Sequence, residues 1–73
     1  MERISRIYVK NIDVSPEAFI EMIDTIATEG YHINKDTITI ENATSAMLHE
    51  LTELKSELAQ KDKTIFITIG GGM

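Results

Sequence analysis

Apolar and polar residues alternate along two segments of this chain. In residues 3–12, Ile7 and Val9 are separated by polar or aromatic side chains, and every second residue of 64–69 is an isoleucine. Alternate residues of a strand point to opposite faces of a sheet, so such strands bury one face only. A parallel sheet covered on both faces would need continuous apolar strands. The pattern therefore predicts a sheet with helices on one face and the other face open.

A short polar turn lies in the middle of the chain. Residues 31–34 and 37–41 supply apolar side chains on either side of Asn34-Lys35-Asp36, which predicts two short strands joined as a hairpin. The turn lacks the glycine that tight hairpins favour. A loop before a single strand, and hence a three-stranded sheet, is the alternative.

The first predicted helix begins at Ser15-Pro16-Glu17. Serine caps free N–H groups, proline fits the first helical position, and glutamate suits the positive end of the helix dipole. The apolar residues that follow share one face at helical spacing: Phe19, Ile20, Ile23, Ile26 and Ala27. Gly30 is expected to end this helix in a left-handed conformation.

The second predicted helix runs from a cap at Asn42 to about Lys61. Its apolar stripe consists of Met47, Leu48, Leu51, Leu54 and Leu58. Four of these residues follow alternating spacings of four and three, as in a coiled coil. Because Leu48 widens the stripe, packing against the sheet is favoured over pairing with a second helix.

The resulting order is strand, helix, strand, strand, helix, strand, which is the ferredoxin-like order of elements. Right-handed crossover connections then place the first strand between the third and the fourth. The predicted fold is an α+β two-layer sandwich, with two helices on one face of a four-stranded sheet. The residues expected to face the helices are Ile7, Val9, Ile33, Ile38, Ile40, Ile65, Ile67 and Ile69.

The 73 residues allow one domain, with residues 70–73 expected to form a flexible glycine tail. A core this small makes a homodimer a reasonable expectation. The absence of cysteine excludes disulfides and thiolate metal sites. No apolar run approaches the roughly 20 residues needed to cross a bilayer. No signal-peptide core is present either, so a cytoplasmic location is expected.

Catalytic motifs are not recognisable in the sequence. The serines lack a nucleophile elbow or a paired histidine, and the only glycine cluster, residues 70–72, is no phosphate loop. His49 and Glu53 lie one helical turn apart, but two ligands do not make a metal site. We therefore expect a protein that is not an enzyme and has no cofactor or metal.

The open sheet face carries two aromatic residues with cations nearby: Arg6, Tyr8, Lys10 and Phe66. Single-stranded nucleic acid binds such faces, with bases stacked on aromatics and phosphates near basic residues. A dimer interface or a plain surface is the favoured interpretation of this face. Nucleic-acid or nucleotide binding is the alternative function.

The first predicted helix is acidic, and so is the whole chain, which has 12 acidic and 7 basic residues and a net charge of −5. This balance argues against non-specific binding to duplex DNA. The residues expected to face a partner protein are Glu17, Glu21, Asp24 and Glu29. The favoured hypothesis is a small acidic regulator or inhibitor, of the kind that phages and mobile elements encode against host nucleases or defence proteins. A solvated helix face is the simpler interpretation.

Overall fold

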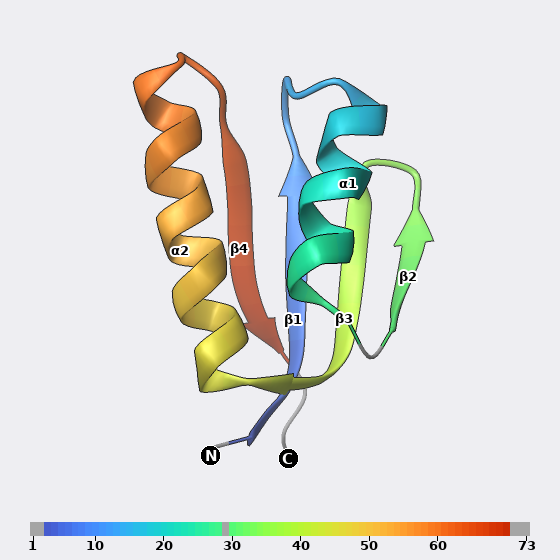
Figure 1. Ribbon diagram of the computed structural model, residues 1–73. Coiled ribbons are helices and arrows are strands. Elements are labelled where there is room, and N and C mark those ends of the chain that lie inside the picture. Colours follow the sequence, from blue (N-terminus) through green and yellow to red (C-terminus); the bar gives the residue numbers. More distant parts are fainter. Residues whose placement is uncertain (1–2, 29, 71–73) are drawn as a thin grey trace.

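The computed structural model describes residues 3–28 and 30–70 of the chain (Figure 1). It is an α+β structure with two helices and a four-stranded antiparallel sheet. The elements are β1 (Arg3–Asn11), α1 (Pro16–Ile26), β2 (Tyr31–Asn34), β3 (Thr37–Thr44), α2 (Ser45–Gln60) and β4 (Ile65–Gly70). Neither helix in this described part is long and apolar enough to cross a membrane.

The strands lie side by side in the order β2-β3-β1-β4. The predicted position of the first strand, between the third and the fourth, is therefore confirmed. Figure 1 shows both helices on the same face of the sheet. Helix α2 packs against β4, and β2 forms the opposite edge.

The core lies between the helices and one face of the sheet. Its buried residues are Ile7, Val9, Val14, Phe19, Ile23, Ala27, Ile38, Ile40, Ala43, Leu51, Leu58 and Ile65. The alternation predicted for β1 is confirmed, since Ile7 and Val9 are fully buried. Ile33 and Ile69 pair with buried Ile38 and Ile7 and so lie on the predicted helix-facing side of the sheet, but about half of each residue is exposed and neither belongs to the buried core. Both lie on edge strands.

The central hairpin is confirmed, and the three-stranded alternative is wrong. Strands β2 and β3 pair antiparallel from Asn34 opposite Thr37 to Tyr31 opposite Ile40. Two residues form the turn, and the first of them, Lys35, has a φ of 60°. Lysine thus occupies the left-handed conformation that glycine would adopt more easily.

Helix α1 begins as predicted but ends earlier. The Ser15 hydroxyl accepts a hydrogen bond from the Ala18 N–H at 3.4 Å, and Pro16 is the first helical residue. The prediction that Gly30 ends the helix in a left-handed conformation is wrong. The helix ends at Ile26, with Ala27 as its C-cap, and Gly30 has a φ of 128°, beyond the left-handed helical region.

Asn42 does not cap helix α2, contrary to the prediction. It lies inside β3 with a φ of 55°, at a bulge where Glu41 pairs with Arg6 and Ala43 with Ser5. Because the bulge absorbs the extra residue, the strand continues beyond it. The cap is Thr44, whose hydroxyl accepts a hydrogen bond from the Met47 N–H at 3.3 Å.

The prediction that Gly70 belongs to a flexible glycine tail is wrong. Gly70 is the last residue of β4 and pairs with Arg6, so it belongs to the sheet. The rest of the predicted tail, residues 71–73, lies outside the described residues.

Candidate partner-binding site

An acidic stripe runs along one flank of α1. It consists of Glu17, Glu21 and Asp24, which are all exposed. Residues three and four positions apart are neighbours on a helix surface, so the three carboxylates form one continuous row. The predicted shared face is therefore confirmed.

A hydrogen bond shows which way this stripe faces. The Tyr31 hydroxyl on β2 donates to the Asp24 carboxylate at 3.2 Å. Partial burial, this hydrogen bond and the nearby Asp24 charge raise the pKa of Tyr31 above its usual value. The acidic stripe thus lies on the flank of α1 that is turned toward the edge strand β2.

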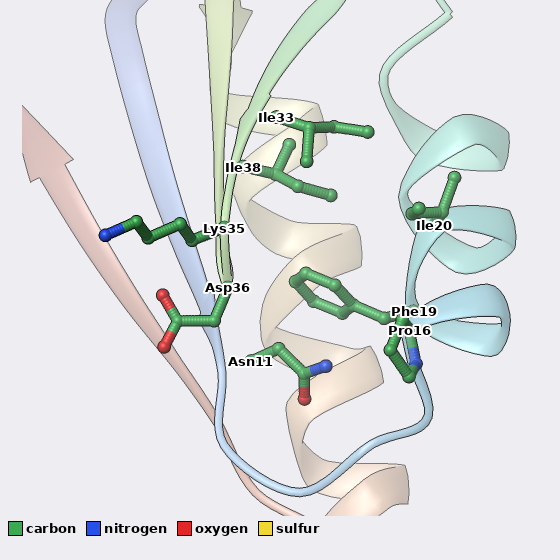
Figure 2. A pocket seen from close by; sticks show the side chains of 8 residues that line it. All are labelled: Asn11, Pro16, Phe19, Ile20, Ile33, Lys35, Asp36 and Ile38. Atoms are coloured by element: carbon green, nitrogen blue, oxygen red, sulfur yellow. The ribbon is translucent and has the colours of Figure 1, made fainter.

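A groove of about 130 Å³ lies between this flank of α1 and the hairpin. Figure 2 shows Phe19 pointing from α1 toward the strands, and Ile33 and Ile38 pointing back toward α1. The groove is lined by Asn11, Pro16, Phe19, Ile20, Ile33, Lys35, Asp36 and Ile38. Its walls are therefore mainly apolar, with polar groups near the hairpin turn.

The groove exists because α1 leaves the edge strand uncovered. Ile33 is 50% exposed, whereas Ile38, its partner on β3, is 1% exposed. Ile20 on α1 stays partly buried on the opposite wall. Since Ile20 lies three residues after Glu17 and four before Asp24, the acidic stripe borders the groove directly.

Other acidic residues near α1 do not belong to the stripe. Asp13 accepts a hydrogen bond from the Thr64 N–H at 2.7 Å and so connects the loop after β1 to the start of β4. Its role in the structure is to hold two loops together. Glu29, the fourth residue predicted to face a partner, lies outside the described residues.

The open face of the sheet carries the four residues predicted for nucleic-acid binding. Lys10 pairs with Phe66 across β1 and β4, and Tyr8 pairs with Thr68. Phe66 is 52% exposed. The cations and aromatics therefore share one uncovered face, as the alternation predicted.

The Tyr8 ring on this face lies against Gly70. A methyl group placed on Gly70 would overlap the Tyr8 ring, so the ring lies over the glycine backbone. Gly70 and Phe66 lie on opposite sides of Thr68 along β4, and Thr68 is the residue opposite Tyr8. The structure thus places the two aromatics on adjacent strands, with the Tyr8 ring over Gly70.

Both histidines form exposed pairs with glutamate. His32 lies 3.0 Å from Glu41, and His49 lies 3.4 Å from Glu53. Across residues 3–28 and 30–70, no group of three or more histidine or acidic side chains is placed to hold a metal ion.

No family model, curated protein or solved structure matches this chain. Sequence reasoning identified the acidic stripe and placed Ile33 on the helix-facing side of the sheet, but it missed the groove that lies between them. The signal that could have found it is the predicted strand order, which places residues 31–34 at an edge of the sheet.

Proposed function

We propose that this chain is a non-enzymatic, cytoplasmic binding protein of ferredoxin-like fold that binds and regulates another protein. The observation that carries the proposal is an apolar groove bordered by the acidic stripe of Glu17, Glu21 and Asp24. An apolar side chain of the partner fills the groove, and lysine or arginine residues beside it contact the carboxylates.

The size and charge of the site support this mode of binding. An apolar cavity of about 150 Å³ holds a benzene molecule, so a groove of about 130 Å³ suits one apolar side chain. Exposed carboxylates attract a basic partner and speed its association, and the net charge of −5 acts in the same direction.

Proteins that process nucleic acids are a class of partner whose surface charge would complement the acidic stripe. Such proteins carry basic surfaces toward the phosphate backbone. An acidic stripe competes for such a surface, and this is how a small inhibitor of a nuclease would act. We therefore propose that the partner is a host nuclease or defence protein and that this chain inhibits it.

A selection from a random peptide library tests the proposal and does not require an identified partner. Selected peptides are expected to combine an apolar residue with flanking lysine or arginine. Replacing Glu17→Lys and Glu21→Lys together should weaken their binding about tenfold, since each exposed ion pair contributes about 0.2–1 kcal/mol and reversal adds repulsion. Asp24 is kept because Tyr31 bonds to it.

Matched control variants separate the site from general effects. Glu50→Lys with Glu57→Lys makes the same charge change on exposed positions of α2. Ile33→Ser opens the groove, and Ile12→Ser replaces another half-exposed isoleucine outside it. Equal loss of peptide binding in the site and control variants, or a selection that enriches no peptide, would refute the proposed function.

Binding of single-stranded nucleic acid through the open face is the second candidate function. The observation that favours it is the exposed Phe66 opposite Lys10, with Arg6 and Tyr8 on the same face. It predicts binding of a labelled single strand that weakens steeply with salt and is lost in Phe66→Ala. No binding at low salt would eliminate this candidate.

We also propose that the chain forms a homodimer through the open face or the adjoining β4 edge. Pairing through the β2 edge would bring two acidic stripes together, and like charges repel. Phe66 borders both remaining surfaces, so Phe66→Glu should convert a dimer to a monomer of 8.2 kDa in sedimentation. Ile33→Glu is the control and should leave the dimer intact.

A further inference from the structure

Backbone hydrogen bonds fix the direction in which residues of β1 point. The Asn11 N–H donates to the Asp36 carbonyl at 2.7 Å, beside β3. The Ile12 N–H donates to the Thr64 carbonyl at 3.2 Å, beside β4. The backbone N–H and C=O groups of successive residues point to opposite sides of a strand. From position 7 on, the N–H and C=O groups of the odd-numbered residues of β1 therefore point toward β3.

The same alternation determines which groups of β2 are free. Ile38 pairs with Val9, which is one of these odd-numbered residues, so the N–H and C=O groups of Ile38 point toward β1. The N–H and C=O groups of the next residue, Thr39, therefore point toward β2. Thr39 pairs with His32, whose N–H and C=O are therefore used inside the sheet. The residues on either side of it, Tyr31 and Ile33, direct their N–H and C=O groups away from the sheet.

This free edge adjoins the groove. Figure 1 shows β2 as the outermost strand, with no described element beyond it. The Ile33 side chain lines the groove while its backbone groups point outward. An extended chain laid along β2 would therefore bond to the edge and direct every second side chain to the helix face of the sheet.

We propose that the partner segment binds as an added strand along β2. The inference rests on the proposed function and specifies how the partner is held. One helix-facing side chain of the segment is apolar and enters the groove beside Ile20 and Ile33. Its helix-facing neighbours, two positions away, are lysine or arginine and contact the acidic stripe.

Charge favours a basic segment over a second copy of this chain. A two-fold pairing of β2 with β2 would place two acidic stripes on the same side of one continuous sheet, where like charges oppose association. A basic segment instead contacts Glu17, Glu21 and Asp24 with opposite charge.

Amide hydrogen exchange, followed by NMR, tests this inference residue by residue. The probe is the synthetic peptide Thr-Lys-Thr-Leu-Thr-Lys-Thr with blocked ends, which places leucine and both lysines on one face of a strand. At about ten times its Kd, exchange of the Tyr31 and Ile33 amides should slow about tenfold. The His32 and Asn34 amides, which already point into the sheet, should change little.

A control peptide of identical composition tests the register of side chains. Exchanging the leucine with the threonine before it places leucine on the opposite face from the lysines. This peptide should bind at least about tenfold more weakly, because its apolar side chain can no longer enter the groove together with the lysine contacts. Equal binding of the two peptides would overturn strand addition.

Peptide N-methylation gives a second measurement that leaves side chains unchanged. N-methylation should abolish binding at peptide residues whose N–H points toward β2, because it removes a hydrogen bond to the edge. It should be tolerated at the intervening peptide residues, whose N–H groups point away from β2. Uniform tolerance would overturn strand addition.

The two proposals fail in different ways. Peptide binding that depends on Glu17 and Glu21 but leaves the Tyr31 and Ile33 amides unprotected would retain the proposed function and reject strand addition. If neither this peptide nor any library peptide binds, both proposals are wrong.

Discussion

The two edge strands carry isoleucines in different surroundings. On β4, Ile65 is fully buried, and α2 packs against the strand. On β2, Ile33 points to the same face of the sheet but remains half exposed. The helix beside β4 is also the longer one, since α2 has 16 residues and α1 has 11. The β4 edge thus contributes Ile65 to the core, although its Ile69 is half exposed, whereas the β2 edge forms a wall of a groove.

The charges at the two edges differ as well. Neither β2 nor β4 contains an Asp, Glu, Lys or Arg residue, but β2 has only four residues and the acidic stripe of α1 lies beside it. Short edge strands with nearby charges resist uncontrolled pairing. Under the proposed function, the carboxylates beside β2 select a basic partner, and the proposed homodimer forms at the open face or the β4 edge instead.

The largest expected difference between the edges is in folding stability. Ile65→Ala should lower the free energy of unfolding by about 2–5 kcal/mol, because it leaves a cavity in the core. Ile33→Ala should cost less than about 1 kcal/mol, since half of that side chain is already in water. Urea unfolding of both variants measures the difference, and equal losses would contradict the contrast between the edges.

A second prediction concerns the end of β4. Gly70→Ala should cost about 0.5–1.5 kcal/mol, because the added methyl group overlaps the Tyr8 ring and forces this side chain away from its rotamer. The same change in a Tyr8→Ala background should cost markedly less, which a double-mutant cycle of urea unfolding measures. Identical costs in the two backgrounds would show that the ring does not lie over the glycine.

The turn beside β2 allows a stabilising change. Lys35→Gly should raise the free energy of unfolding by a few tenths to about 1 kcal/mol. It removes about 1–2 kcal/mol of left-handed strain and adds about 0.5–1 kcal/mol of chain entropy cost. Asp36→Gly is the control and should give no gain, because Asp36 is not among the residues with positive φ. Thermal unfolding of both variants decides the sign.

The smallest expected effect is a dependence on high pH at β2. The pKa of Tyr31 is raised in the folded state, so the unfolded chain loses its proton first and the stability from this group is lost as pH rises above 10. In a Tyr8→Phe background, Tyr31 is the one remaining tyrosine, and a pH titration of tyrosinate absorbance should give a midpoint for its ionisation above pH 10. Asp24→Ala should lower this midpoint, and an unchanged midpoint would show that Asp24 does not influence Tyr31.

The elements of this fold could be predicted from local patterns. Alternation identified β1 and β4, and Ser15-Pro16 identified the start of α1, because each signal acts within a few residues. The errors fall where tertiary structure overrides a local signal. Asn42 resembles a helix cap, but it serves as a bulge that keeps β3 paired with β1.

The candidate site could be predicted only in part. The spacing of the acidic stripe follows from helical periodicity and needs no tertiary information. The groove depends on where α1 crosses the sheet, and no local pattern encodes that position. Ile33 therefore had the sequence signature of a core residue, although the structure leaves half of it in water.

The central position of β1 has a consequence for how fast the chain folds. One of its neighbours is β4, where Asn11 pairs with Ile65 and Arg6 with Gly70, and the Asp13–Thr64 hydrogen bond closes the same long loop. Contacts between residues so distant in sequence require loop closure before they contribute stability, and they slow folding. We expect the folding rate to depend on how quickly α2 brings β4 beside β1, and not on helix formation.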